Sequence, residues 1–139
     1  MDDKFNLIER SPTVEEYLKL RKAVGWENVD IVAAKIGLQN SLFSVCAIYK
    51  DEVIGCGRVV GDEGLYFYIQ DVIIMPAFQK QGIGKSIMDA LISYLASHAA
   101  SNAFIGLMAA KGVSKFYEQY GFAERPADGP GMFKIWGKL

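Results

Sequence analysis

The feature that most constrains the fold is an apolar run that leads through a glycine-containing loop into a periodic segment. The run LYFYIQDVIIM, residues 65–75, becomes almost continuously apolar toward its end, which is typical of a strand buried on both faces. Apolar residues then recur over residues 83–95 at the spacing of an amphipathic helix. The loop QKQGIGKSI, residues 79–87, overlaps the start of this segment. The order predicts a strand, a loop and a helix whose N-terminus faces the loop.

The rest of the chain supplies further strands and helices. We expect strands over residues 5–10, 42–60, 103–109 and 132–139, the second being a hairpin around Lys50, Asp51 and Glu52. We expect helices over residues 11–26, 30–41 and 112–122. The first helix should have Ser11 as its N-cap and Pro12 at its first position, and the second should be capped by Asp30. A helix between the central strand and the strand at 103–109 predicts that these two strands are parallel.

Composition indicates one soluble domain over residues 1–139. Apolar residues make up 51% of the 139 residues, enough for a single core, and the net charge of −1 comes without a basic block that could follow a nucleic acid. The N-terminus lacks an apolar signal segment, and no window is apolar enough to span a membrane, so we expect a cytoplasmic protein. Cys46 and Cys56 lack the spacing of a metal site, and we expect reduced core residues and no metal.

The loop at 79–87 fails both familiar nucleotide motifs by one residue. A P-loop requires glycine where the chain has Gln79, and a dinucleotide fingerprint requires glycine where it has Ile87. A strand, a loop with Gly82 and Gly84, and a helix start remain, and together they suit a phosphate or pyrophosphate. A tight turn alone would also account for the two glycines.

The sequence QKQGIG resembles the Q/R-x-x-G-x-G/A signature of the GNAT superfamily of acyl-CoA-dependent N-acyltransferases. The preceding strand and Pro76, in DVIIMPAFQKQGIG, match the same pattern, and KFYEQYGF at residues 115–122 resembles the family's F-Y-x-x-x-G-F. The resemblance covers roughly residues 43–139. It implies an α/β (α+β) fold, with a mixed central sheet flanked by helices and with central strands that splay apart at an acetyl-CoA site.

The resemblance also implies which residues bind the cofactor. Backbone N–H groups of the loop would hold the coenzyme A pyrophosphate, and the loop residues are Gln79, Lys80, Gln81, Gly82, Ile83, Gly84 and Lys85. Val72, Ile73 and Ile74 would lie on the splayed strand whose main chain pairs with the pantetheine arm. One N–H there, of Ile73 or Ile74, would face the thioester oxygen.

Acyl transfer from a thioester to an amine needs a neutral amine, a stabilised oxyanion and a proton for the departing thiolate. Tyr117 matches the family position that protonates the sulfur, although its spacing also suits core packing. Asp71 is the carboxylate nearest the splayed segment and a candidate base, although it could instead pair with a cation. Glu63 and Glu27 are alternatives. His98, the single histidine, reads as a helix-end residue.

The acceptor is not identified by any charged groove. We expect its pocket to include the region around Trp26 and the segment RPADGPGMF, residues 125–133, and a small-molecule amine and a protein amine both remain open. Where many family members carry an Asn, this chain has Lys111 and Gly112, and Lys111 or Lys115 could approach the 3′-phosphate of the cofactor. A homodimer is expected, and a coenzyme A sensor without turnover is the alternative function.

Overall fold

A computed structural model describes residues 4–137, which divide into two compact units. The first unit extends to Leu107 and the second begins at Met108, and each is described in turn. One domain over residues 1–139 stays a prediction.

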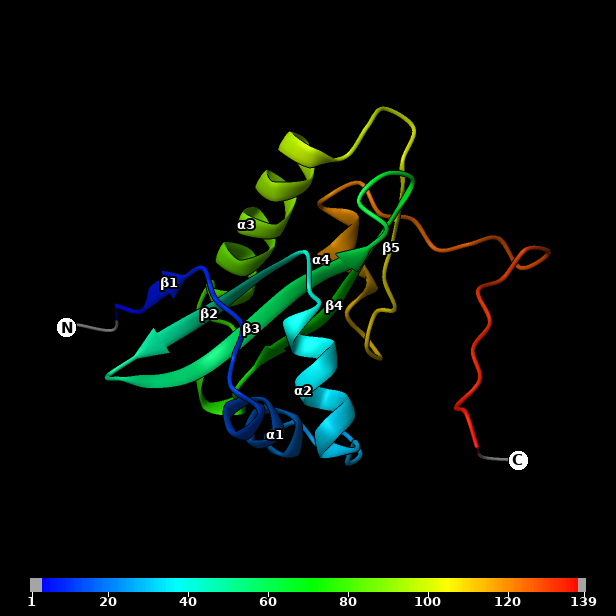
Figure 1. Cartoon of the computed structure of the whole chain (residues 1–139). Coiled ribbons are helices and arrows are strands. Elements are labelled where there is room, and N and C mark those ends of the chain that lie inside the picture. Colours follow the sequence, from blue (N-terminus) through cyan, green and yellow to red (C-terminus); the bar gives the residue numbers. More distant parts are fainter. Residues whose placement is uncertain (1–3, 138–139) are drawn as a thin grey trace. The chain divides into compact units, whose positions relative to one another are not determined.

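The first unit contains a mixed five-stranded sheet, as predicted from the order of elements (Figure 1). The strands lie in sequence order across the sheet: β1 (Asn6–Ile8), β2 (Phe43–Tyr49), β3 (Glu52–Gly61), β4 (Tyr66–Ile74) and β5 (Phe104–Gly106). The first four strands pair antiparallel, whereas β5 runs parallel to β4, which confirms that prediction. Lys50 and Asp51 form the β2–β3 turn with φ values of 48° and 65°, the conformation that a two-residue hairpin favours.

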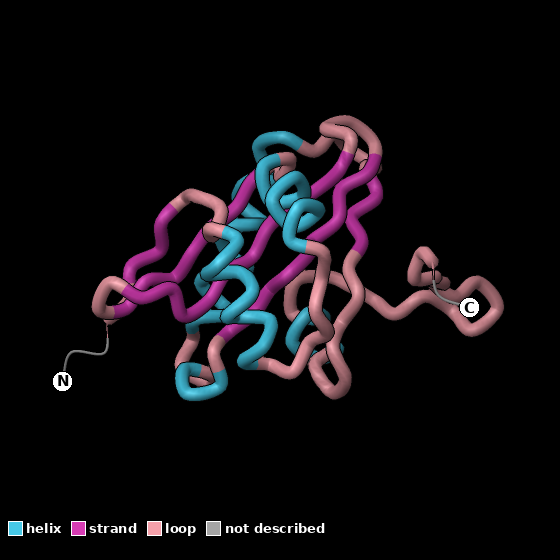
Figure 2. The backbone as a smooth tube through the Cα atoms, turned by 60° about the horizontal axis from the view of Figure 1, so that its bottom comes forward, coloured by secondary structure: helices cyan, strands magenta, loops and turns pink. Residues whose placement is uncertain are grey.

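Helices cover both faces of this sheet, as Figures 1 and 2 show. They are α1 (Val14–Ala23), α2 (Ile31–Gln39) and α3 (Ile83–His98), and the short 3-10 helix η1 (Pro76–Phe78) lies in the loop between β4 and α3. Leu20 of α1 packs in one cluster with Cys46, Cys56 and Ile73. The neighbours of Cys56 along β3, Gly55 and Gly57, lie on the opposite face of the sheet, where a Cβ built at Gly57 would meet Ile87 of α3. No helix within residues 4–137 is long and apolar enough to cross a membrane.

The start of α1 corrects the sequence prediction. The N-cap is Thr13, not Ser11, and the helix begins at Val14, so Pro12 precedes the helix. Thr13 and Glu16 cap each other's backbone N–H groups, which fixes the start at this point. The Ser11 hydroxyl donates instead to the carbonyl of Leu38 at 3.0 Å. Asp30 caps α2, as predicted.

The second unit contains one short helix, α4 (Ser114–Glu118), instead of the helix predicted over residues 112–122. Gly121 follows it with a φ of 89°, the left-handed conformation expected there. The strand predicted over residues 132–139 is not formed over residues 132–137, and the remainder lies outside the described residues. Met132 and Trp136 are each 89% exposed, so this segment buries little apolar surface that could hold it as a strand.

Candidate active site

The loop between β4 and α3 ends in a helix N-terminus that no side chain caps. Lys80 has a φ of 64°, and Gly82, the N-cap of α3, has a φ of 86°. Over the described residues, no side chain accepts a hydrogen bond as a cap of α3, and its first turn carries no acidic residue. The first N–H groups of a helix have no acceptor within the helix, and the helix dipole favours an anion there. The turn that contains Gly82, Ile83 and Gly84 is therefore suited to a phosphate group.

Two glutamine side chains brace this loop from within. Gln79 Nε2 donates to the carbonyl oxygen of Ile74 at 3.0 Å, and Gln81 Nε2 donates to that of Ala77 at 3.2 Å. From the sequence, Gln79 is expected to open the cofactor loop and Gln81 to contribute its backbone N–H, and neither of these side-chain bonds is predicted. Both bonds connect loop residues to carbonyl groups that precede them in the chain.

One edge of β4 is open over most of the strand. β4 pairs with β5 only from Tyr66 to Tyr68, opposite Phe104 to Gly106. Beyond Tyr68, the register partners of β4 within residues 4–137 all lie on β3. The separation of β4 from β5 leaves the main chain of residues 69–74 available on one side, as the splayed strands of the resemblance imply.

The orientation of the peptide groups shows which of them face the open edge. Met75 N–H donates to the carbonyl oxygen of Ile54 on β3 at 2.8 Å. The carbonyl of Ile74 belongs to the same peptide group and therefore points away from β3, where Gln79 reaches it. The backbone N–H and C=O groups of successive residues point alternately to the two sides of a strand. Those of Ile74 and Val72 therefore point to the open edge, and those of Ile73 point to β3. Of the two N–H groups predicted to face a thioester oxygen, the geometry favours that of Ile74.

A bulge at Asp71 sets the orientation of the backbone groups of Val72, Ile73 and Ile74. Arg58 is opposite Gln70 and Cys56 is opposite Ile73, so Gly57 alone faces both Asp71 and Val72. Asp71 has a φ of 58°, a left-handed conformation that costs a non-glycine residue about 1–2 kcal/mol. The extra residue reverses the alternation of side chains, so Ile73 joins the core cluster beneath α1.

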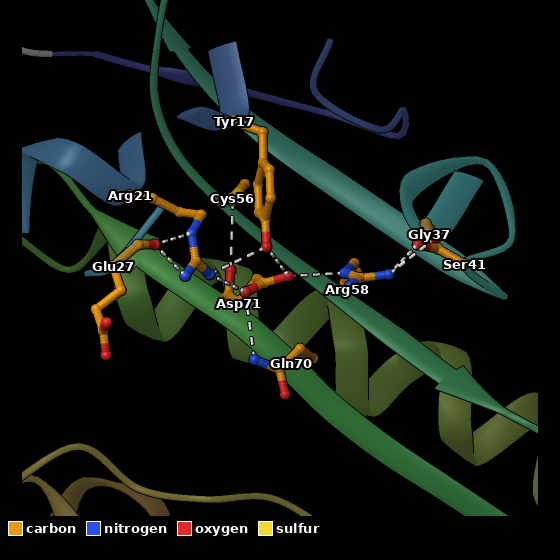
Figure 3. A network of polar contacts seen from close by, with 9 residues as sticks. All are labelled: Tyr17, Arg21, Glu27, Gly37, Ser41, Cys56, Arg58, Gln70 and Asp71. Carbon is orange, nitrogen blue, oxygen red and sulfur yellow. Dashed lines mark hydrogen bonds and ion pairs between the residues drawn. The ribbon is translucent and has the colours of Figure 1, made fainter. Parts of the chain in front are cut away.

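The Asp71 side chain is buried, with 4% of the residue exposed, and four polar side chains surround it (Figure 3). Arg58 Nε and the Tyr17 hydroxyl donate to Oδ2 at 2.8 and 3.0 Å. Gln70 Nε2 donates to Oδ1 at 3.2 Å, and Arg21 Nη1 forms an ion pair with the same oxygen at 3.9 Å. Burial and the nearby Asp71 carboxylate raise the pKa of the Tyr17 phenol, so it remains a donor. We call Tyr17, Arg21, Arg58, Gln70 and Asp71 the Asp71 cluster.

The two arginines connect this cluster to the helical layer. Arg58 Nη1 donates to the carbonyl of Gly37 at 3.0 Å and to the Ser41 hydroxyl at 3.1 Å, at the C-terminal end of α2. Arg21 Nη2 donates to the carbonyl of Glu27 at 2.6 Å, in the loop between α1 and α2. Sequence reasoning missed these roles. The signal for Arg58 was a lone arginine within the apolar run of residues 53–60.

Asp71 was predicted as a candidate base, but its carboxylate is already surrounded by bonded side chains. Both oxygens already accept hydrogen bonds, and Arg58 and Arg21 form ion pairs with them. Asp71 as a base stays a prediction, and the contacts in place are those of a structural ion pair.

Two further polar candidates, Glu63 and His98, lie on other elements than the Asp71 cluster. Glu63 has a φ of 68° in the exposed turn between β3 and β4, and His98 is the last residue of α3, with Nδ1 2.8 Å from the Tyr94 carbonyl oxygen. The position of His98 confirms it as a helix-end residue. Among residues 4–137, no group of three His, Cys, Asp or Glu could hold a metal ion.

Tyr117 lies on α4 in the second unit. Its ring contacts those of Phe116 and Phe122, with centroids 5.1 and 6.4 Å away. Partial burial raises the pKa of the Tyr117 phenol, so the hydroxyl stays protonated at neutral pH. Lys111 and Lys115 are exposed in the same unit. The roles predicted for these three residues stay predictions.

Comparison with known proteins gives one consistent result. A family model described as an acetyltransferase (GNAT) domain matches residues 22–129. An uncharacterized N-acetyltransferase of Porphyra purpurea is 34% identical over 122 residues, which are 85% of this chain and 69% of that protein. A probable acetyltransferase of unknown function from meticillin-resistant Staphylococcus aureus has a similar solved structure, with a TM-score of 0.90 and 32% identity over 96% of this chain and 100% of that one. A GNAT family protein of Streptococcus pneumoniae gives a TM-score of 0.80 and 28% identity, covering 97% of this chain and 100% of that one.

Proposed function

Because the chain belongs to the GNAT family of acetyltransferases, we propose that it transfers an acetyl group from acetyl-CoA to a primary amine within a ternary complex. The observation that carries the proposal is the continuity between the open edge of β4 and the uncapped N-terminus of α3. An elongated ligand with an amide-rich arm and a pyrophosphate fits both features at once. Acetyl-CoA is such a ligand.

The main chain supplies the electrostatic part of the reaction. Loop N–H groups around Gly82, Ile83 and Gly84 hold the pyrophosphate. The outward N–H of Ile74 donates to the thioester oxygen, which gains negative charge as the amine attacks. These donors are fixed in place by the strand and by the Gln79 bond, so little reorganisation is needed during the reaction.

The acceptor amine approaches from the side of α1 and α2. Trp26, in the loop between these helices, packs against the core cluster that contains Ile73, and Met75 packs against the same cluster. Arg21 holds this loop through the Glu27 carbonyl and lies 5.4 Å from the centre of the Trp26 ring. We assign the acceptor to the primary amines, either of a small molecule or of a protein. Glu27, Glu63 and solvent water are the candidates for taking the amine proton, since the oxygens of Asp71 are already bonded.

Tyr117 donates the proton that the departing thiolate requires. Its raised pKa keeps the phenol protonated, so this step should not weaken as the pH rises from 7 to 9. We expect Tyr117→Phe to lower kcat roughly 100-fold, while acetyl-CoA affinity and the melting temperature stay nearly unchanged. Steady-state kinetics with a calorimetric titration test this. Near wild-type kcat, with chemistry shown to be rate-limiting, would return Tyr117 to a packing role.

The proposed function is tested by two measurements on the wild-type chain. Acetyl-CoA is titrated by calorimetry, and thiol release is followed across polyamines, amino-acid amides and lysine-containing peptides. We expect saturable binding and thiol release that depends on at least one amine. Binding without release on any of these amines would favour a coenzyme A sensor, and failure to bind would contradict the proposal.

A further inference from the structure

The Asp71 cluster lies beneath the part of β4 whose main chain faces the open edge. Asp71 is the bulged residue. Val72 and Ile74, whose backbone N–H groups point to the open edge, lie one and three residues after it. The direction of these two N–H groups depends on the bulge, because adding or removing one residue reverses which backbone groups of the strand point to each side. Whatever holds the bulge therefore sets the geometry of this edge.

Asp51 is left-handed in a turn, where this conformation is common, whereas Asp71 is left-handed within a strand, where its surroundings must hold it. The Asp71 carboxylate has such surroundings: Arg58 from β3, Tyr17 and Arg21 from α1, and Gln70 from β4 itself. Figure 3 shows these side chains converging on the carboxylate from three elements. No buried side-chain polar atom of the described residues lacks a hydrogen-bond partner, so the cluster is complete without a ligand.

The outer contacts of the two arginines show that the cluster is anchored. Arg58 reaches the carbonyl of Gly37 and the hydroxyl of Ser41, while Arg21 reaches the carbonyl of Glu27. Both guanidinium groups are mostly buried, with 16% and 15% of their side chains exposed. Planar guanidinium groups that bond on two sides hold their partners at fixed angles. The bulge is thereby tied to α1, to the end of α2 and to the loop between them.

We propose that the Asp71 cluster is a positioning device for acetyl-CoA: it fixes the β4 bulge so that the main chain of Val72 and Ile74 meets the pantetheine arm, and Asp71 takes no proton from the acceptor amine. The proposal rests on the proposed function, since it concerns the same cofactor. Arg58 is the main positioning residue, because it makes the shortest contact with Asp71 and connects it to α2.

Two probes separate positioning from general structural support. Acetyl-CoA carries the pantetheine arm, whereas 3′-phosphoadenosine 5′-diphosphate carries the pyrophosphate without the arm. Only the first probe reaches Val72 and Ile74, and both reach the loop at the start of α3. A variant that merely loosens the fold affects both probes alike, whereas a variant that misplaces the bulge affects acetyl-CoA alone.

The variants are Arg58→Met, Arg58→Lys and the milder Tyr17→Phe, which removes one donor to Asp71 and keeps the aromatic ring. Calorimetric titrations are made at a temperature where each variant is folded. We expect Arg58→Met to bind acetyl-CoA about 10-fold more weakly, with the affinity for the arm-less nucleotide unchanged. Arg58→Lys should recover part of the loss, and Tyr17→Phe should lose about 3-fold even if Arg58→Met fails to fold.

Asp71→Asn distinguishes positioning from base catalysis. Asn tolerates the left-handed conformation but cannot accept a proton at neutral pH. The proposal expects weaker acetyl-CoA binding and a pH profile of turnover that keeps its wild-type shape. Turnover that is slower by roughly 100-fold or more, with unchanged acetyl-CoA affinity, would make Asp71 the base and overturn the proposal.

Equal losses for both probes, or no loss for either, would also overturn it and leave the cluster a structural ion pair. If the wild-type chain binds neither probe, the proposed function fails first and the positioning role fails with it. That outcome is recognised before any variant is made.

Discussion

The two faces of the sheet carry different kinds of side chain, although the same strands form both. On the α3 face, Gly55 and Gly57 let the helix approach so closely that a Cβ at Gly57 would lie 2.6 Å from Ile87. On the α1 face, apolar residues such as Cys56 and Ile73 share the space with a buried carboxylate and two arginines. One face is close-packed and apolar, and the other holds the Asp71 cluster.

This difference indicates what each face is for. Apolar close packing stabilises without directional demands, whereas buried ion pairs often contribute no more than well-packed hydrophobic residues would. A buried ion pair does fix geometry, since each partner must be met at a set distance and angle. The apolar face holds α3 against the sheet, whereas the charged face has the role that we propose for it, which is to fix the bulge of β4.

The largest expected effect comes from breaking the buried ion pair. Arg58→Met leaves the carboxylate of Asp71 without its nearest partner and should lower the free energy of unfolding by about 3 kcal/mol. Arg10→Met is the matched control, since it breaks an Arg–Glu16 contact of 2.9 Å whose side chains are 39% and 31% exposed, and it should cost less than about 1 kcal/mol. Urea denaturation measures both. If both variants lost the same free energy of unfolding, the buried Arg58–Asp71 ion pair would contribute no more to stability than the exposed Arg10–Glu16 pair.

On the opposite face, Gly57→Ala should lower the free energy of unfolding by about 1–3 kcal/mol, because the new methyl group meets Ile87 at 2.6 Å and Leu91 at 3.3 Å. Gly37→Ala is the control, since nothing lies within 4 Å of its added Cβ, and in α2 it should stabilise by up to about 1 kcal/mol. Thermal unfolding of the two variants tests this. A stabilised Gly57→Ala would show that α3 does not approach β3 so closely.

A smaller, pH-dependent effect concerns the two cysteines on the α1 face. Burial raises the pKa of the Cys46 thiol to about 11 and raises that of Cys56 further above the usual range. Folding therefore favours the neutral thiols, and this stabilisation is complete below about pH 8.5, the usual pKa of an unfolded cysteine, and is lost as the pH rises toward 11.

At pH 8, a disulfide reagent should modify the folded chain about 100-fold more slowly than the urea-unfolded chain, and the folded rate should rise about tenfold per pH unit up to pH 10. A folded rate that levels off near pH 9 would mean that these thiols are not buried as described.

The elements that follow local rules could be predicted from the sequence. The strand over residues 65–75, the helix that begins at Ile83, the cap at Asp30 and the hairpin turn at Lys50 all depend on residues near one another in the chain. The start of α1 was missed by two residues because two caps competed locally, and the reciprocal bonds of Thr13 and Glu16 prevailed over Ser11. The last strand was wrong over residues 132–137, since a β-prone pattern does not supply a partner strand.

The candidate site could be predicted only in part, for the same reason. The loop at Gly82 was visible as a motif, and its conformation follows from glycine. Pairing of Asp71 with a cation could be expected from the sequence, but its partners Tyr17 and Arg58 could not be named, because they lie far from it in the sequence and meet it only in the folded chain. The bulge that brings them together is a property of two strands at once, and neither strand shows it alone.

The central claim, that the N-terminus of α3 binds the pyrophosphate of acetyl-CoA, is tested most directly by Gly84→Asp with Gly84→Ala as its control. Gly84 is the second residue of α3, where an aspartate is favourable for the helix by about 0.3–1 kcal/mol, so the fold should not suffer. The same charge repels a bound phosphate. A calorimetric titration should show acetyl-CoA binding at least roughly 30-fold weaker in Gly84→Asp than in Gly84→Ala, at equal or higher melting temperature. Equal affinity of the two folded variants for acetyl-CoA would contradict the account.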